Sequence, residues 1–166
     1  MMPESIWPSA PAAVFPPPPV GGGDEDWLAW AATSPGSTAL HIVPTRLDLD
    51  GVRLYVDESA TPLNPNGAVH GGIVAAICDQ AISLAIMRRM PGGRAIVTGT
   101  LNLEYLRPAL PRLEVTAWVD RVARSLVFAR AEIRSAGALT TLATGTFVPV
   151  EIPLWAPDDV DRGVGG

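Results

Sequence analysis

The segment Asn64-Pro-Asn-Gly-Ala-Val-His-Gly-Gly-Ile-Val-Ala-Ala-Ile-Cys-Asp79 governs how this chain folds. It begins with turn-forming residues, passes through His-Gly-Gly, and leads into a segment from Ile73 to Met87 in which nearly every residue is apolar. A helix that is apolar on all sides is normally buried in a protein core. An unpaired carboxylate in such a place is costly, because a low dielectric disfavours charge. Asp79 is therefore the residue of this helix that most needs a functional explanation.

The composition of the whole chain limits the classes of protein it can belong to. Its 166 residues suit a single domain with a sizeable core. A hydrophobic fraction of 48% and a charged fraction of 17% are typical of a globular protein. The net charge of −5 argues against a nucleic-acid partner, because phosphate binding requires a basic face.

The cysteine content and the N-terminus indicate the cellular compartment. A single cysteine, Cys78, excludes an internal disulfide and suits a reducing cytosol, and on an apolar helix it is expected to be a small buried side chain. The proline-interrupted N-terminus lacks the features of a signal peptide. No stretch of 18 residues is free of polar interruption, so we expect a cytoplasmic protein without a membrane span.

Three regions are expected along the chain. Residues 1–23, rich in proline and glycine, are predicted to form a flexible arm, and residues 151–166 a flexible tail. Residues 24–150 are predicted to form the domain, which opens with an accessory helix over 24–34 that Ser34-Pro35-Gly36 ends. Trp27 and Trp30 of this helix either pack on the core, which we favour, or form a lid over a substrate mouth.

Alternating apolar and polar residues predict strands on both sides of the central helix. Asp50-Gly51 predicts a hairpin within residues 39–59, and Ser135-Ala-Gly137 predicts a second hairpin near the C-terminus. The central helix is expected to end at Arg88-Arg89-Met90, and further strands are predicted at residues 95–106, 113–122, 126–134 and 139–148. One long helix with antiparallel strands makes an α+β domain, a sheet wrapped around a single helix.

These elements and motifs resemble those of the hotdog-fold acyl-CoA thioesterases of the PaaI-like group. The resemblance covers about residues 39–150. It is carried by the following residues: Asn64, Gly67, His70-Gly71-Gly72, Asp79, Val97-Thr98, Asn102-Leu-Glu-Tyr-Leu-Arg-Pro108 and Val119-Asp-Arg-Val-Ala-Arg124-Ser-Leu-Val-Phe128. It implies hydrolysis of an acyl- or aryl-acyl-CoA to free acid and CoA. It implies no separate cofactor and no metal, because coenzyme A is part of the substrate.

The same resemblance implies a homodimer with antiparallel helices and an active site across the interface, and such dimers often pair into tetramers. Helix geometry makes the same demand independently. Asp79 lies eight residues beyond Gly71, which is about 12 Å along one helix at 1.5 Å per residue. No thioester carbonyl can touch both residues of one chain, whereas an antiparallel neighbour would bring its own Asp79 to the first helix N-terminus.

The helix start and Asp79 receive the main chemical roles. A helix N-terminus offers unpaired backbone N–H groups, and Gly71 and Gly72 have no Cβ, so a carbonyl can approach these groups closely. In the family the N–H that corresponds to Gly71 polarises the thioester carbonyl, which is oxyanion-hole chemistry. Asp79 of the partner subunit would attack the carbonyl or activate a water that does.

Supporting roles are expected for three further residues. His70 is expected to cap or orient the helix start and not to act as the base. Asn64 matches the family residue that helps to place the water or the carboxylate. Thr98 falls where the family often has a hydroxyl near the nucleophilic water, although a threonine in a strand is common in any protein.

Arginines are the candidates for binding the phosphates of coenzyme A. Arg124 matches the family best, although Ala123 stands where the family usually has glycine, and Arg121 and Arg89 are further candidates. The acyl group is not specified by the sequence. The apolar residues that could line a tunnel for it are Ile73, Ile77, Ile82, Leu84, Ile86, Trp27 and Trp30.

Two other functions fit parts of this pattern. A hotdog protein could bind acyl-CoA without turnover, as a sensor or a carrier. A hydratase acting on enoyl thioesters is the weaker alternative, because those enzymes use an Asp followed by a His, whereas here His70 precedes Asp79 and the second histidine is His41.

Overall fold

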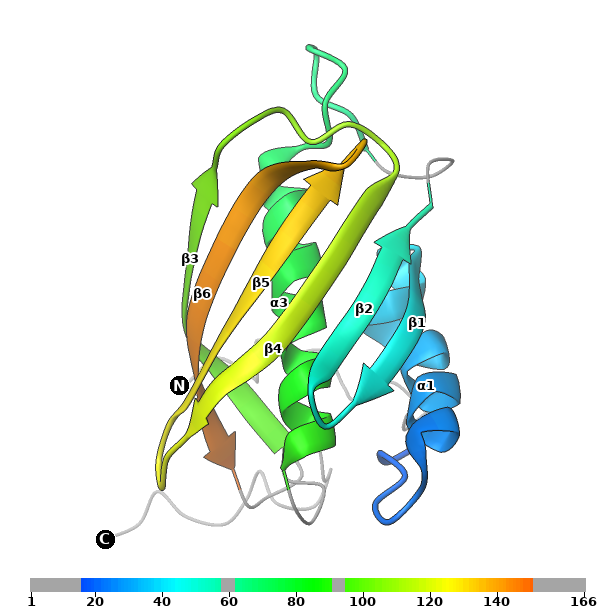
Figure 1. The fold of residues 1–166 in the computed structure, drawn as a ribbon, viewed down its shortest axis with the longest axis vertical. Coiled ribbons are helices and arrows are strands. Elements are labelled where there is room, and N and C mark those ends of the chain that lie inside the picture. Colours follow the sequence, from blue (N-terminus) through cyan, green and yellow to red (C-terminus); the bar gives the residue numbers. More distant parts are fainter. Residues whose placement is uncertain (1–15, 58–61, 91–94, 151–166) are drawn as a thin grey trace, which may run out of the picture.

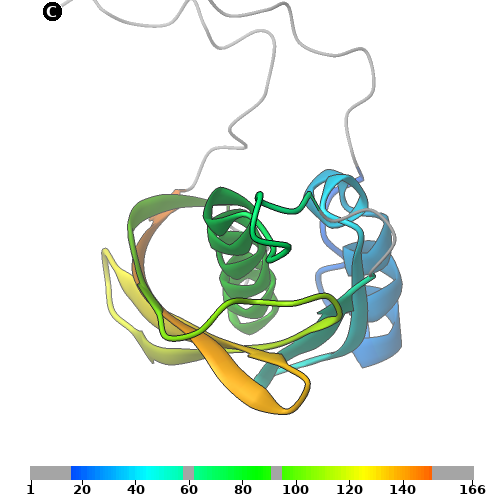
Figure 2. The same cartoon turned by 90° about the horizontal axis from the view of Figure 1, so that it is seen from above.

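A computed structural model describes residues 16–57, 62–90 and 95–150 of the chain. Of the flexible arm predicted over residues 1–23, residues 1–15 lie outside these described residues, as does the flexible tail predicted over 151–166. Six antiparallel strands form one sheet in the order β1-β2-β4-β5-β6-β3. The strands are β1 (Ile42–Asp48), β2 (Gly51–Val56), β3 (Ala95–Tyr105), β4 (Leu113–Val122), β5 (Val127–Ser135) and β6 (Ala138–Val150). The sheet curves around the long helix α3 (Gly71–Arg89), which confirms the predicted α+β hotdog fold (Figures 1 and 2).

The strands follow the alternation of the sequence, because successive side chains point to opposite faces of a sheet. In β4, Val115, Ala117 and Val119 are buried against α3, and the residues between them face outward. The predicted hairpin between β1 and β2 turns at Leu49 and Asp50 and closes at Gly51. Gly51 has a φ of 148°, and a Cβ there would lie 2.3 Å from the Ala117 carbonyl oxygen, so glycine is required at this position.

Helix α3 is buried on one side only. The four side chains of Ile77, Ile82, Leu84 and Ile86 are completely buried in the core. They fill the space between helix and sheet, so the prediction that they line a tunnel is wrong. The opposite face of α3, which carries Asp79, is half-exposed, so the expectation of a helix buried on all sides is wrong as well.

By length and composition α3 is also long and apolar enough to cross a membrane, with a mean hydropathy of 1.4. The sequence was not expected to contain such a segment. Core helices of globular proteins meet the same criterion, and the sheet covers one side of α3 (Figure 2).

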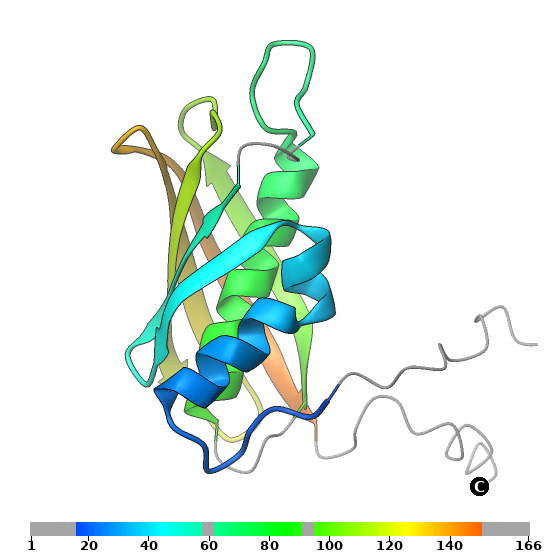
Figure 3. The same cartoon turned by 90° about the vertical axis from the view of Figure 1, so that its right-hand side faces the viewer.

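Two shorter helices precede the sheet. α1 (Asp24–Thr33) packs against β1, and Arg88 of α3 reaches its first turn to contact Asp24 and Trp27 (Figure 3). Trp27 is only 3% exposed within the core, which confirms the packing alternative over the lid. The α1 helix ends as predicted, but the chain continues directly into α2 (Pro35–Ala39), which the sequence did not predict. Ser34 caps α2, and the Gln80 side chain of α3 donates hydrogen bonds to the hydroxyls of Ser34 and Ser37.

Strand β3 forms one edge of the sheet and pairs with β6 alone among the described strands. A β-bulge between Thr98 and Thr100 adds one residue, Gly99, to β3. Because a bulge shifts the alternation by one residue, Thr98 and Tyr105 both face α3 although their numbers differ by seven. Residues 97–100 are exposed along the unpaired edge.

Candidate active site

In the part of the chain that the structure describes, one backbone N–H in the first turn of α3 has no acceptor. His70 is the N-cap, and its Nδ1 accepts a hydrogen bond from the Gly72 N–H at 3.3 Å, which confirms the predicted capping role. The N–H groups of Ile73 and Val74 donate to the His70 carbonyl oxygen at 2.9 and 3.1 Å. The Gly71 N–H has no acceptor among the described residues. It is therefore free to bind a ligand oxygen at the positive end of the helix dipole.

Tyr105, at the end of β3, contacts the same turn. Its hydroxyl donates a hydrogen bond of 2.8 Å to the Gly71 carbonyl oxygen. The sequence placed Tyr105 within a family motif but gave it no role. Strict alternation would have put it on the face opposite to Thr98, so only the bulge could have identified it.

Asp79 lies in the middle of α3 and is half-exposed. Its Oδ1 accepts a hydrogen bond of 2.9 Å from the Thr98 hydroxyl of β3. Its Oδ2 has no protein partner among the described residues. One carboxylate oxygen is thus held in place, and the other is available for a water or a substrate.

Gly71 and Asp79 are not brought together within the chain. They are eight residues apart on one straight element, a separation of about 12 Å along the axis. The structure therefore joins Thr98 to Asp79 and Tyr105 to Gly71, as two separate half-sites.

Asn64 lies in the loop before α3. Its Oδ1 accepts hydrogen bonds from the backbone N–H groups of Asn66 (2.9 Å) and Ala68 (3.3 Å), so this oxygen holds the turn together. Asn64 also borders a cleft of about 400 Å³ between this loop, the start of α3 and the segment after β3. Gly71 and Tyr105 line the same cleft, so the free N–H lies beside a space where a substrate could bind.

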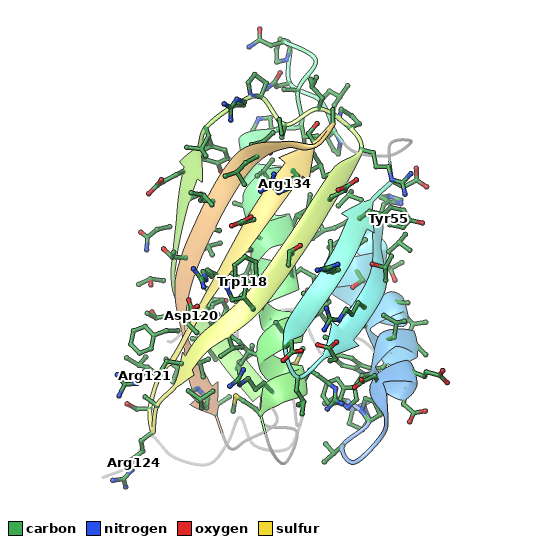
Figure 4. The ribbon with its side chains drawn as sticks, in the orientation of Figure 1. Tyr55, Trp118, Asp120, Arg121, Arg124 and Arg134 are labelled. Atoms are coloured by element: carbon green, nitrogen blue, oxygen red, sulfur yellow. The ribbon has the colours of Figure 1, made fainter. Side chains whose placement is uncertain are left out.

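The candidate coenzyme A ligands lie far from Gly71 in the chain. Arg121 and Arg124 are exposed at the β4–β5 hairpin, at the end of the sheet opposite to the loop before α3 (Figures 1 and 4). Arg89 is exposed at the C-terminal end of α3, and its guanidinium donates to the Leu49 carbonyl oxygen at 3.5 Å. Arg88 instead forms an ion pair with Asp24 and stacks on a tryptophan of α1, so its role is structural.

Cys78, next to Asp79, is completely buried. Burial, with a smaller contribution from the negative charge of Asp79, raises the pKa of the Cys78 thiol to about 12. The thiol is therefore protonated at neutral pH, as expected of a packing residue. Within the described part of the chain, no three His, Cys, Asp or Glu side chains gather in a way that could hold a metal ion.

Comparisons with known proteins identify the family to which the chain is similar. Residues 66–141 match the sequence pattern of the thioesterase superfamily. The chain is 34% identical over 104 residues to a "putative esterase" of Halobacterium salinarum, which covers 61% of this chain and 66% of that protein. It is 30% identical over 98 residues to a "putative esterase" of Pseudomonas aeruginosa, which covers 58% of this chain and 72% of that protein. The chain thus spans roughly two thirds of the length of these relatives.

A solved structure is similar as well. It is a variant of the phenylacetic acid degradation protein PaaI from Thermus thermophilus. Its fold superimposes with a TM-score of 0.63 at 28% sequence identity, covering 70% of this chain and all (100%) of that one.

Proposed function

Because the chain belongs to the thioesterase superfamily, we propose that it is an acyl-CoA thioesterase that hydrolyses an acyl- or aryl-acyl-CoA to free acid and CoA. In the proposed reaction, a water oxygen adds to the thioester carbonyl carbon, the carbon–sulfur bond breaks, and the CoA thiol leaves with a proton. Alternatively, the Asp79 carboxylate attacks the thioester carbonyl carbon and CoA leaves as the thiol. Water then hydrolyses the acyl-enzyme, and the products are the same.

The observation that carries the proposal is the free N–H of Gly71 at the start of α3. A thioester carbonyl placed there would have its developing negative charge stabilised by this donor and by the helix dipole. The cleft beside Gly71 offers the space for the acyl group. Asn64 borders this cleft, and its side-chain amide nitrogen, which has no hydrogen-bond partner among the described residues, could bind the substrate or a water.

The carboxylate must then come from a second subunit. We propose a homodimer in which Asp79 of the partner subunit reaches the Gly71 N–H of the first. Two surfaces support this arrangement: the edge of β3 exposes unpaired backbone groups, which readily pair with another strand, and the neighbouring face of α3 is half-exposed. Thr98, at this edge, would orient Asp79 and its water. Pairing of dimers into tetramers remains a prediction, as does the cytoplasmic location.

The same antiparallel arrangement would supply cations for coenzyme A. Within one chain, Arg121 and Arg124 lie at the end of the sheet opposite to the start of α3 (Figure 4). A two-fold axis would carry the partner's copies of these arginines toward the first subunit's site. We propose that they bind the phosphates of the nucleotide, with Arg89 as a further candidate.

The test of the activity is release of CoA thiol from a panel of short, long and aromatic acyl-CoA esters. Wild type is compared with Asp79→Asn, after folding and oligomeric state have been checked for both proteins. Loss of a carboxylate that acts as a general base is expected to lower kcat by roughly a hundredfold or more. Binding of the esters without thiol release by wild type would support a sensor or carrier instead, and equal turnover by both proteins would refute the role of Asp79.

The shared site has its own test by subunit complementation. Asp79→Asn chains are mixed, through unfolding and refolding, with Gly71→Pro chains, which lack the Gly71 N–H. Each variant alone is expected to be nearly inactive. The mixture is expected to recover about a quarter of wild-type activity, because half of the dimers are mixed and each of these has one intact site of two. If both residues act within one chain, mixing will restore nothing.

A further inference from the structure

The peptide group between Gly71 and Gly72 is held at both of its ends. The Tyr105 hydroxyl donates to its carbonyl oxygen at 2.8 Å, and the His70 Nδ1 accepts from its N–H at 3.3 Å. The two partners come from different parts of the fold, since Tyr105 ends β3 and His70 belongs to the loop before α3. We refer to these two hydrogen bonds as the peptide clamp.

A clamp has a physical purpose at this position. Two adjacent glycines are the most flexible pair a chain can have, and the first turn of a helix lacks the acceptors that fix the later turns. The Gly71 N–H belongs to the neighbouring peptide group, so its direction depends on how the Gly71–Gly72 peptide is held. Misplacement of a catalytic donor by about 1 Å can cost a hundredfold in rate.

The ring of Tyr105 is also close to Gly71. A Cβ on Gly71 would lie 3.6 Å from the phenol carbon that carries the hydroxyl, which is ordinary van der Waals contact. The ring therefore packs against Gly71, whose N–H has no acceptor among the described residues. Burial raises the pKa of Tyr105 above its ordinary value of 10.0, so the phenol remains a hydrogen-bond donor at neutral pH.

We propose that Tyr105 is a positioning residue for hydrolysis, which acts through the peptide clamp by fixing the direction of the Gly71 N–H. The inference rests on the proposed function for its kinetic consequence, but the clamp itself can be observed without turnover. Tyr105 acts without touching the reacting atoms. Its hydroxyl, and not its ring, carries the effect.

The test replaces only the hydroxyl. Tyr105→Phe is compared with wild type and with Tyr55→Phe, a matched control on the outer face of β2, where the ring stacks under Arg112 at 4.5 Å (Figure 4). Tyr105→Phe is expected to lower kcat about tenfold, the scale of one neutral hydrogen bond, with KM changed less than about twofold. Tyr55→Phe is expected to leave both constants unchanged. Unchanged kcat in Tyr105→Phe, or a change in KM alone, would overturn the proposal.

A spectroscopic measurement separates positioning from general stability. The probe is a ketone analogue of the substrate in which a methylene replaces the thioester sulfur, and its carbonyl stretching frequency is measured by infrared spectroscopy. Binding to wild type is expected to lower this frequency, and binding to Tyr105→Phe is expected to lower it less. Equal shifts in the two proteins would mean that the N–H is held without Tyr105.

Amide hydrogen exchange distinguishes failure of this inference from failure of the proposed function. The Gly72 N–H is expected to exchange faster in Tyr105→Phe than in wild type, whatever the reaction catalysed. If wild type releases no thiol but Gly72 exchange still responds, the proposed function fails and the clamp stands. If thiol is released and Gly72 exchange is the same in both proteins, the clamp fails and the proposed function stands.

Discussion

Replacing Gly71 by proline removes the proposed oxyanion donor and almost nothing else. Gly71 is the first residue of α3, where proline is favoured because its fixed φ suits the helix and its missing N–H has no intrahelical acceptor. The preceding residue, His70, already has the extended conformation that a following proline requires, with φ −60° and ψ 133°. We therefore expect Gly71→Pro to fold, and to be as stable as wild type or up to about 1 kcal/mol more stable, because proline restricts the unfolded chain.

The expected kinetic effect is large. Loss of one oxyanion-hole donor typically lowers kcat by about 10²–10³, or about 2.7–4 kcal/mol of transition-state stabilisation. The matched control is Gly71→Ala, which keeps the N–H. Its Cβ would meet the Tyr105 ring at 3.6 Å, an ordinary contact, so this variant is expected to retain kcat within about threefold of wild type.

The assay is the same release of CoA thiol, with kcat measured at saturating ester and the unfolding free energy measured by urea titration. A large loss of kcat in Gly71→Pro with little loss in Gly71→Ala would assign the effect to the N–H group itself. Equal losses in both variants would indicate a steric effect of any side chain at this position. Wild-type kcat in Gly71→Pro would refute the assignment of this N–H as the oxyanion donor.

Thr98→Val removes the hydrogen bond to Asp79 and is expected to lower kcat about tenfold. Thr98→Ser keeps the hydroxyl and is expected to retain most of the wild-type kcat. Similar kcat values for the two variants would show that the hydroxyl does not contribute to the reaction. His70→Ala is expected to lower the unfolding free energy by about 1 kcal/mol through loss of the N-cap, and His70→Asn, which can cap α3, by much less; equal stability of the two would count against capping. Cys78 is expected to resist iodoacetamide in the folded protein at pH 9 and to react once the protein is unfolded, because burial raises its pKa to about 12. Between the ordinary thiol pKa of 9.0 and about 12, the Cys78 thiol loses its proton in the unfolded chain but keeps it in the folded one, so the unfolding free energy is expected to fall as pH rises through this range. Denaturation of wild type and Cys78→Ala at increasing pH tests this, because the variant is expected to lack this part of the fall.

Most of the local structure could be predicted from the amino-acid sequence alone. The period of the apolar residues predicted the strands and the single long helix. Asp79 stood out because a carboxylate does not suit an apolar helix, and His70 and Gly71 stood out as part of a family motif at the start of that helix. The bounds came within about two residues of the observed ones, since turns and caps use residues with distinctive backbone preferences. The separation of about 12 Å between Gly71 and Asp79 also followed from the sequence, because a helix has a fixed rise per residue.

What these residues touch depends on the tertiary fold. The sequence could not tell which face of α3 would be buried, because an almost uniformly apolar helix has no pattern to orient it. Four of the possible tunnel residues, Ile77, Ile82, Leu84 and Ile86, proved to be core residues for that reason. The same holds for Tyr105: one extra residue, Gly99, shifts the alternation of β3 and brings both Thr98 and Tyr105 onto α3. The bulge forms in the pairing of β3 with β6, a contact between distant segments. Gly99 inside the strand is the local hint of it, because glycine within a strand often marks a bulge, but the hint does not say which side chains then face α3.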